Sequence, residues 1–372
     1  MKVYQCIRAY DPYIPAFENK YRINENNYSF SELRNLLIKD GFAATYILKP
    51  ALDGNEKEFF FTLWNYKTLQ FKWAEENGLK TRDLDEIRLA QVEVFKPDVY
   101  YNFSPYYDSK VLEKMLMKKE MIKVCWDSVI GSRYPSFHEN YNLRFTLFQP
   151  YVMFWKQHGF NAFLLPPAFP DNWENLNKTE KDIDLLFYGQ YNESFFTKRN
   201  RIVHELLAWS KRKNLNFKLY LQFPKVKKPF INIRGFRNYT RWIPVAPKEI
   251  MNNALPPIYG SQLYEIIAKS KIVVNAFGNY NGMFKENMRN YESIGCGAFL
   301  ISEDGIYPEH FIPNIDFYTY RSTSDLFYKI EQVLSRPDKG FKLAQNTRDK
   351  LKIIYSKEVQ WNNFVNAVNS LG

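Results

Sequence analysis

Cysteine and histidine are scarce in this chain of 372 residues, and their scarcity argues against two kinds of site. The three cysteines lie in apolar surroundings without metal-ligand spacing, and an odd number does not suit a disulfide framework; they are Cys6, Cys125 and Cys296. The four histidines form no HxxxH or HExxH pattern, so a structural zinc site is not expected. They are His138, His158, His204 and His310.

Long apolar runs are also missing from the chain. No stretch approaches the roughly 20 apolar residues that a membrane-spanning helix needs. The N-terminal segment 1–12 reaches charge at Arg8 and Asp11, too early for the apolar region of a signal peptide. We therefore expect a cytoplasmic protein, whose contact with a membrane, if any, is peripheral and at the inner face.

Acidic residues are fewer than basic ones: 40 Asp and Glu against 51 Lys and Arg give a net charge of +11. Such an excess suits nucleic acid, an anionic membrane surface or a phosphorylated small substrate. No long Lys/Arg run forms the basic stripe typical of nucleic-acid binders, so nucleic acid is not expected as a partner. The most basic stretch, 223–242, predicts a surface loop with strand fragments. This loop is either merely solvated, or it covers a nucleotide base or holds a phosphorylated or lipid-linked acceptor.

Segments typical of strands and of helices alternate along the whole chain, which predicts parallel sheets built from βαβ units. In the first half we expect strands over 2–10, 43–50, 97–104 and 121–128, and helices over 29–42, 83–95 and 109–119. The helix over 29–42 has Ser31 as its expected N-cap. The pattern restarts with a strand over 183–190, after the polar, Pro- and Asn-containing stretch 165–182.

The length of the chain favours two domains, with the polar stretch as the linker. We expect one α/β domain over 1–175, a second over 176–345, and a C-terminal helix over 346–372 that packs back on the first. In doubly wound sheets, ligands lie beyond the carboxyl ends of the strands. The expected site is therefore a cleft between the two domains.

The stretch 285–297 carries charge beside two glycines. A helix starting near Phe284 would place Lys285, Arg289 and Glu292 within roughly a 60° arc of one face. Cations at a helix N-terminus suit a diphosphate, and the carboxylate can accept hydrogen bonds from ribose hydroxyls. Arg289 and Glu292 can equally form an ordinary surface ion pair three residues apart.

The segment 258–305 resembles the C-terminal half of GT-B glycosyltransferases, most closely the spore-maturation-protein (CgeB-like) branch of the group 1 glycosyltransferases. The matching positions are Tyr264, Lys271 to Asn275, Arg289, Glu292 and Gly297. The resemblance is good over about 180–372, and over 1–175 it extends mainly to the order of the elements. It implies two Rossmann-like domains that face a cleft, with a nucleotide-sugar donor held by the C-terminal domain.

The resemblance also implies roles for individual residues. Glu292 matches the carboxylate that binds the donor ribose. The groups expected to hold or stabilise the diphosphate are Lys285, Arg289, Arg199, Gly189 and Gln190. The wider group 1 family often has a second Glu eight residues earlier, but that position is Phe284, and Glu286 would lie on a different helical face. The stereochemical course of the transfer is therefore open.

An inverting transfer needs a base within hydrogen-bond reach of the acceptor hydroxyl. The candidates at strand ends of the first domain are Asp127, Asp11 and His138. Asp127 is preferred because it ends an apolar strand at the expected cleft. Each of the three can equally be a structural cap or turn residue, and a retaining enzyme would not need this base.

Together these observations favour a glycosyltransferase that moves a sugar from a nucleotide-sugar donor to a glycan, lipid-linked or protein acceptor in surface polysaccharide or glycoconjugate synthesis. No Asp-x-Asp pair ends a strand, so we expect metal-independent transfer and no cofactor besides the donor. The alternatives are a nucleotide-sugar epimerase of the same fold and a non-enzymatic protein that binds nucleotides or nucleic acid.

Overall fold

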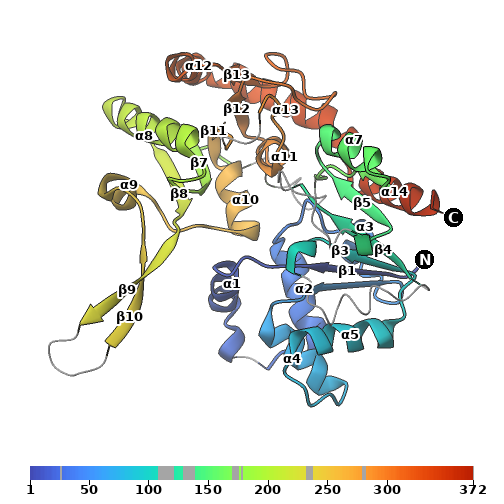
Figure 1. The fold of residues 1–372 in the computed structure, drawn as a ribbon. Coiled ribbons are helices and arrows are strands. Elements are labelled where there is room, and N and C mark those ends of the chain that lie inside the picture. The colour runs from blue at the N-terminus through green and yellow to red at the C-terminus, as the bar shows by residue number, and fades with distance from the viewer. Residues whose placement is uncertain are drawn as a thin grey trace. The chain divides into compact units, whose positions relative to one another are not determined.

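The computed structural model describes residues 1–25, 27–107, 121–128, 139–169, 176, 179–231, 238–278 and 282–371. The chain forms two compact units (Figure 1). The N-terminal unit consists of Met1–Asn172, Tyr259–Ser261 and Lys352–Gly372, and the C-terminal unit of Trp173–Ile258 and Gln262–Leu351. Within the part of the chain that is described, no helix is long and apolar enough to cross a membrane.

The N-terminal unit is built on a six-stranded parallel sheet in the order β2-β1-β3-β4-β5-β6. Its strands are β1 (Val3–Ile7), β2 (Phe59–Leu63), β3 (Val99–Asn102), β4 (Ile122–Trp126), β5 (Leu143–Thr146) and β6 (Ala162–Leu164). All residues of β1, β2, β3 and β5 are buried. Burial on both faces explains why these strands are continuous apolar runs rather than alternating ones.

The helices of this unit include one from the far end of the chain. They are α1 (Tyr13–Tyr21), α2 (Phe30–Asp40), α3 (Lys49–Leu52), α4 (Lys67–Glu76), α5 (Leu84–Phe95), α7 (Gln149–Gln157) and α14 (Lys357–Asn369), with 3-10 turns at Ile23–Glu25 and Pro105–Tyr107. The fully buried Lys357 donates to the carbonyl of Ile47 at 2.7 Å. Gln360 donates to the carbonyls of Thr45 and Pro166 at 2.9 and 3.0 Å. These bonds hold α14 to the N-terminal unit.

Two expectations for this unit are wrong, and a third is not tested. Residues 43–50 are not a strand: they form turns that lead into α3, and the side chain of Gln5 bonds both the carbonyl of Tyr46 and the N–H of Leu48. The strand beside β1 is β2 instead. The N-cap of α2 is Ser29 rather than Ser31, and Ser29 forms a capping box with Glu32. The helix expected over 109–119 lies outside the described residues.

The C-terminal unit is built on a five-stranded parallel sheet in the order β13-β12-β11-β7-β8. Its strands are β7 (Ile183–Gln190), β8 (Phe217–Gln222), β11 (Ser270–Asn275), β12 (Phe299–Glu303) and β13 (Tyr318–Tyr320). The helices are α8 (Thr197–Arg212), α9 (Lys248–Asn253), α10 (Gly260–Ala268), α11 (Met288–Gly295), α12 (Thr323–Ser335) and α13 (Pro337–Ile354). The predicted class, α/β with two Rossmann-like parallel sheets, is confirmed.

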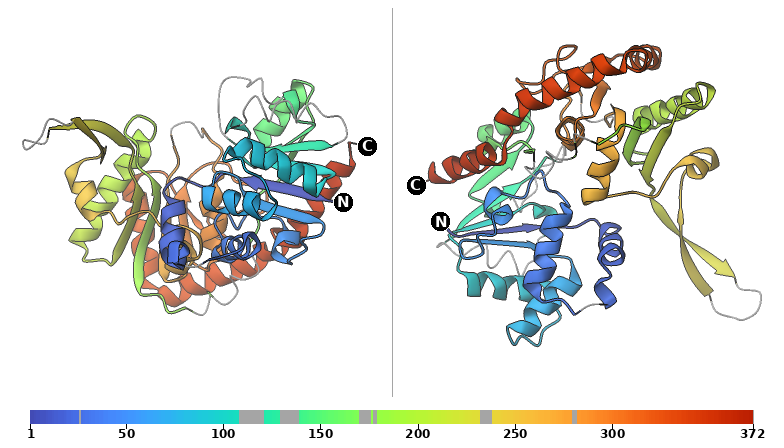
Figure 2. Two further views of the ribbon diagram at one scale, coloured as in Figure 1. Left: turned by 90° about the horizontal axis from the view of Figure 1, so that it is seen from below. Right: turned by 180° about the vertical axis from the view of Figure 1, so that it is seen from behind.

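The basic stretch 223–242 is not a loop with strand fragments. It contains most of an antiparallel hairpin formed by β9 (Lys225–Ile231) and β10 (Asn238–Pro244). The hairpin makes a separate two-stranded sheet, which extends away from the rest of the C-terminal unit in every view (Figure 2).

Candidate functional site

Polar residues gather where three strands of the C-terminal sheet end. Gly189 and Gln190 close β7, Asn275 closes β11 and Glu303 closes β12. Because the strands are parallel, their carboxyl ends lie at one edge of the sheet, where α/β proteins bind ligands. This edge is the candidate site of the C-terminal unit.

Gly189 allows an arginine to lie against the end of β7. Its φ of 150° is one that other residues rarely adopt, and a Cβ added there would overlap the guanidinium of Arg289. The Nε of Arg289 donates to the carbonyl of Tyr188 at 2.9 Å. Two of the predicted site residues are thus in direct contact.

The side chain of Asn275 is hydrogen-bonded to residues at the start of α11. Its amide nitrogen lies 2.8 Å from Oδ1 of Asn290 and 3.1 Å from Oδ1 of Asn287. Its own oxygen accepts from Nη1 of Arg289 at 3.4 Å. The N-cap Asn287 makes no side-chain hydrogen bond to the first turn of α11. The N–H of Asn290 bonds the carbonyl of Asn287 at 3.2 Å, and the positive end of the helix dipole at this N-terminus suits an anion.

Glu292 is buried and hydrogen-bonded to a residue of β7. It is 3% exposed, and the hydroxyl of Tyr188 donates to its Oε2 at 2.7 Å. Burial raises the pKa of Glu292, while the Tyr188 hydroxyl and the charge of Arg289 act to lower it. The alternative of an ordinary surface ion pair between Arg289 and Glu292 is therefore wrong. The predicted contact of Glu292 with ribose stays a prediction.

Lys285 does not share a helix face with Arg289, because α11 begins only at Met288. The residues before the helix are extended and pair with Ile306, whose carbonyl accepts from the N–H of Lys285 at 2.8 Å. The ammonium of Lys285 is buried, donates to the carbonyl of Gly282 at 2.9 Å and lies 3.4 Å from Glu303. The expected helical arc is corrected accordingly.

Glu303 interacts with several hydrogen-bond donors, and it was not among the predicted site residues. Its Oε2 accepts from Lys198 at 2.7 Å, besides its contact with Lys285, and its Oε1 accepts from the N–H of Phe277 at 2.8 Å. It is 2% exposed. The available signal was its place, a carboxylate directly after a buried apolar strand.

Arg199 lies in the first turn of α8, next to the end of β7. Its Nη2 donates to the carbonyl of Gln190, and its guanidinium lies over the ring of Phe196 at 3.6 Å. Arg199 is 5% exposed. Arg199 and Arg289 thus bond backbone carbonyls at the same strand end, those of Gln190 and Tyr188.

The three candidate bases belong to the N-terminal unit and differ in environment. Asp127, directly after β4, is 5% exposed and accepts a 2.5 Å hydrogen bond from the hydroxyl of Tyr106. Burial, followed by the charge of Asp127, raises the pKa of Tyr106 far above its usual range, so this hydroxyl remains the donor. Asp11 is exposed and pairs with Arg8 at 2.8 Å. His138 lies outside the described residues.

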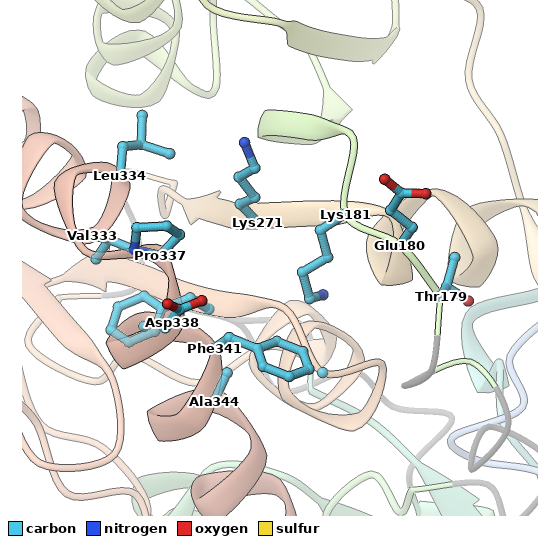
Figure 3. A pocket seen from close by; sticks show the side chains of 13 residues that line it. Thr179, Glu180, Lys181, Lys271, Val333, Leu334, Pro337, Asp338, Phe341 and Ala344 are labelled. Atoms are coloured by element: carbon cyan, nitrogen blue, oxygen red, sulfur yellow. The ribbon is translucent and has the colours of Figure 1, made fainter.

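A cavity of about 290 Å³ lies at the opposite edge of the C-terminal sheet (Figure 3). Lys181, Lys271 and Phe299, at the starts of β7, β11 and β12, line it together with Phe341 of α13. Lys181 donates to the carbonyls of Ala268 and Ser270, and burial lowers its pKa to about 8. This cavity is distinct from the candidate site, because it lies at the amino ends of the strands.

The sequence profile of a known family matches part of the chain. Residues 199–362 match the sequence profile of the family described as glycosyl transferase-like. No curated protein sequence matches the chain significantly. The predicted spore-maturation branch stays a prediction.

Solved structures of low sequence identity share the architecture. Anabaena HepE, in complex with UDP and glucose, is 9% identical with a TM-score of 0.58, and the match covers 100% of both chains. Sucrose-phosphate synthase from Thermosynechococcus elongatus is 10% identical with a TM-score of 0.53, covering 100% of this chain and 99% of that one. The chain has the GT-B fold.

A third match is partial. A mutant of TarM from S. aureus, in complex with fondaparinux, alpha-GlcNAc-glycerol and UDP, is 13% identical with a TM-score of 0.54. The match covers 77% of this chain but only 59% of the TarM chain. The chain thus spans less than two thirds of the length of TarM.

We predict that Gly189→Ala disrupts the site. The added Cβ meets the guanidinium of Arg289 in a strained backbone conformation, so we expect a loss of about 2–4 kcal/mol in the free energy of unfolding. Gly78→Ala is the control, because Gly78 also has a positive φ (71°) but has no atom within 4 Å of the added Cβ. Chemical denaturation of both variants measures the difference. Equal losses would show that the contact with Arg289 is unimportant.

Glu286 lies two residues before α11, and its raised pKa can be tested by measuring the free energy of unfolding at several pH values. Its carboxylate accepts from the hydroxyl of Tyr291 at 2.6 Å, and burial raises its pKa from 4.5 to about 8. The folded state therefore keeps a proton that the unfolded chain releases between these values. It follows that the free energy of unfolding contributed by this group falls as the pH rises from 4.5 to 8, and is constant above that range.

We predict that Glu286→Gln removes this fall, since the amide cannot ionise. The difference in unfolding free energy between variant and wild type should shift in favour of the variant as the pH rises from 5 to 8. Denaturation at several pH values measures it, with the exposed Glu309→Gln as the control. A difference that does not change with pH would contradict the raised pKa.

Proposed function

We propose that the chain is a glycosyltransferase that transfers a sugar from a nucleotide-sugar donor to a glycan, lipid-linked or protein acceptor. The observation that carries this proposal is the contact of Arg289 with Gly189 beside the N-terminus of α11. There an arginine, a helix N-terminus and a strand end without a Cβ converge, as a bound diphosphate requires. The match of residues 199–362 to the glycosyl transferase-like family supports it independently.

In the proposed reaction the bond between the anomeric carbon and the diphosphate oxygen breaks, and the diphosphate leaves with the electron pair. The acceptor hydroxyl oxygen forms the new bond to the anomeric carbon and gives up its proton. Arg289, Arg199 and the N–H groups of α11 would stabilise the charge that develops on the leaving diphosphate. These groups are protein cations and dipoles, so the proposed transfer is metal-independent and needs no cofactor besides the donor.

The roles of the lysine and the two carboxylates follow from their partners. Lys285 is held between Gly282 and Glu303, so we assign it to shaping the loop before α11 as well as to adding positive charge. Glu292, fixed by Tyr188, would accept from the ribose hydroxyls. Surface polysaccharide or glycoconjugate synthesis is the proposed setting.

If the transfer inverts the anomeric configuration, we propose Asp127 as the base. Its burial and its hydrogen bond from Tyr106 hold the carboxylate in one position, whereas Asp11 is exposed and paired with Arg8. A fixed carboxylate is better suited to receive a proton from an oriented hydroxyl than a solvated one.

Donor binding is the first test. A ligand that binds only the folded state raises the melting temperature, so we expect a shift with one class of nucleotide or nucleotide sugar. UDP and UDP-sugars come first in the screen, because the HepE and TarM structures contain UDP. Arg289→Ala should weaken donor binding by about 10- to 100-fold, the loss of a charge-assisted hydrogen-bond donor.

The control for Arg289→Ala is Arg201→Ala, an exposed arginine of α8 paired only at 3.8 Å with Glu205 among the described ion pairs. Wild-type donor affinity in Arg289→Ala would refute the site. Release of free nucleotide only when an acceptor is present distinguishes the transferase from an epimerase. Absence of any nucleotide-sugar turnover would favour a non-enzymatic binding protein.

For the base, we predict that Asp127→Asn lowers transfer by about 10²- to 10⁴-fold while donor affinity is unchanged. Steady-state transfer and donor titration measure the two quantities separately. Asp53→Asn, an exposed carboxylate paired with Lys49, is the control. Full activity of Asp127→Asn would remove it as the base, and a loss confined to Asp11→Asn would assign the role to Asp11.

A further inference from the structure

The cavity at the amino ends of the C-terminal strands has no role in the proposed transfer. Its volume is about 290 Å³, and all its described lining residues belong to the C-terminal unit. A cavity of about 150 Å³ with apolar walls can hold a benzene molecule. The space is therefore large enough for a small organic molecule that contains a ring.

Much of the cavity wall is apolar. Phe299, Val333 and Ala344 line it and are at most 6% exposed. Phe341 lines it too, and this large apolar side chain is 38% exposed. A ligand packed on Phe341 would remove this surface from water, which is favourable. The wall thus favours a ligand with an apolar body.

Lys181 supplies a cation to the same cavity. Its ammonium lies 5.9 Å from the centre of the Phe341 ring, and the two side chains point toward one another (Figure 3). The ammonium donates to the carbonyls of Ala268 and Ser270 at 3.0 and 3.1 Å. Since an ammonium carries three N–H groups, these two bonds leave one for a ligand.

The charge of Lys181 favours an anion as that ligand. Within the described part of the chain, no carboxylate forms an ion pair with Lys181. Burial lowers its pKa because the charged form loses hydration there, and an anion beside it would restore the lost stabilisation. Lys271 on the same wall already bonds Asp184 at 2.7 Å. Lys181 is therefore the cation that an anionic ligand would meet.

One cation matches one negative charge. A phosphate monoester carries nearly two charges at neutral pH, whereas a carboxylate carries one. Two carboxylates of the protein, Glu180 and Asp338, also line the cavity, but both are exposed. Water and salt screen exposed charges more than partly buried ones, so their repulsion should be weaker than the attraction of Lys181.

We propose that this cavity binds a small monocarboxylate with an apolar body. The carboxylate contacts the ammonium of Lys181, and the apolar part packs on Phe341 and Val333. The proposal goes beyond the proposed transfer reaction and does not depend on it, because the candidate site lies at the opposite edge of the sheet.

Calorimetric titration of the full chain with four small probes tests the proposal. Phenylacetate has both features, phenylacetamide lacks the charge, acetate lacks the ring and phenyl phosphate carries a second charge. We expect phenylacetate to bind at least about tenfold more tightly than phenylacetamide or acetate, and more tightly than phenyl phosphate. No binding of phenylacetate, or equal or tighter binding of any other probe, would overturn the proposal.

The variant Lys181→Met removes the charge and keeps an apolar chain. Its affinity for phenylacetate should fall about 10- to 100-fold, the loss of a charge-assisted hydrogen bond. The matched control is Lys269→Met, because Lys269 is exposed, lies between Ala268 and Ser270 in sequence and is not among the described lining residues. The control should bind like the wild type. Equal losses in both variants would overturn the proposal, since attraction would then follow net charge alone.

Lys181→Arg provides the test if Lys181→Met fails to fold. A guanidinium remains charged at all the pH values used, so this variant should bind phenylacetate at pH 7 and at pH 9. The wild type should lose affinity over the same range, because the Lys181 ammonium loses its proton. Loss of binding in the folded arginine variant, or an equal fall with pH in both proteins, would overturn the proposal. The other titratable groups near Lys181 are shared by both proteins: Glu180, Lys271, Asp338 and the buried Cys296.

Competition with a nucleotide separates this cavity from the candidate site. Phenylacetate and UDP should bind without competing, because the two sites lie at opposite edges of the sheet. Competition would place the probe at the candidate site and overturn the proposal. Failure of the wild type to bind any donor would bear only on the transferase, since the phenylacetate titration needs no donor.

Discussion

The guanidinium of Arg289 lies against the backbone of Gly189, and the arrangement of the candidate site depends on this contact. It connects the end of β7 to the start of α11, two elements about a hundred residues apart in the sequence. The bond to Tyr188 and the bond from Tyr188 to Glu292 extend the same connection through the helix. A side chain at position 189 would push the arginine away from the strand and loosen each of these bonds.

The buried carboxylate of Glu303 at this edge is held by more than one element of the fold. Glu303 accepts from α8, from the segment after β11 and from the loop before α11. A buried carboxylate without such partners would cost several kcal/mol, so these bonds are a condition of its burial. The consequence is that the loops around the strand ends are positioned by electrostatics as much as by packing.

The sequence was sufficient for the elements whose signals are local. The apolar run 183–190 is β7 over the same bounds, and the strand–helix alternation led to two parallel sheets. The sequence alone was insufficient where contacts with distant segments determine the local conformation. Residues 43–50 are apolar enough for a strand, but the side chain of Gln5 holds them in turns. Lys285 precedes α11 because Ile306 pairs with its backbone. The partners of Glu303 likewise come together only in the fold.

The cavity at the amino ends of the C-terminal strands has a practical consequence. Amine reagents attack only the neutral form of lysine, and the lowered pKa of Lys181 makes this form more abundant than in an ordinary lysine, which is almost entirely charged at neutral pH. A reporter group attached at Lys181 would therefore mark the C-terminal unit from the edge opposite the candidate site. The fold thus contains its own position for a spectroscopic label, placed where it would leave the strand ends that hold Arg289 and Glu303 untouched.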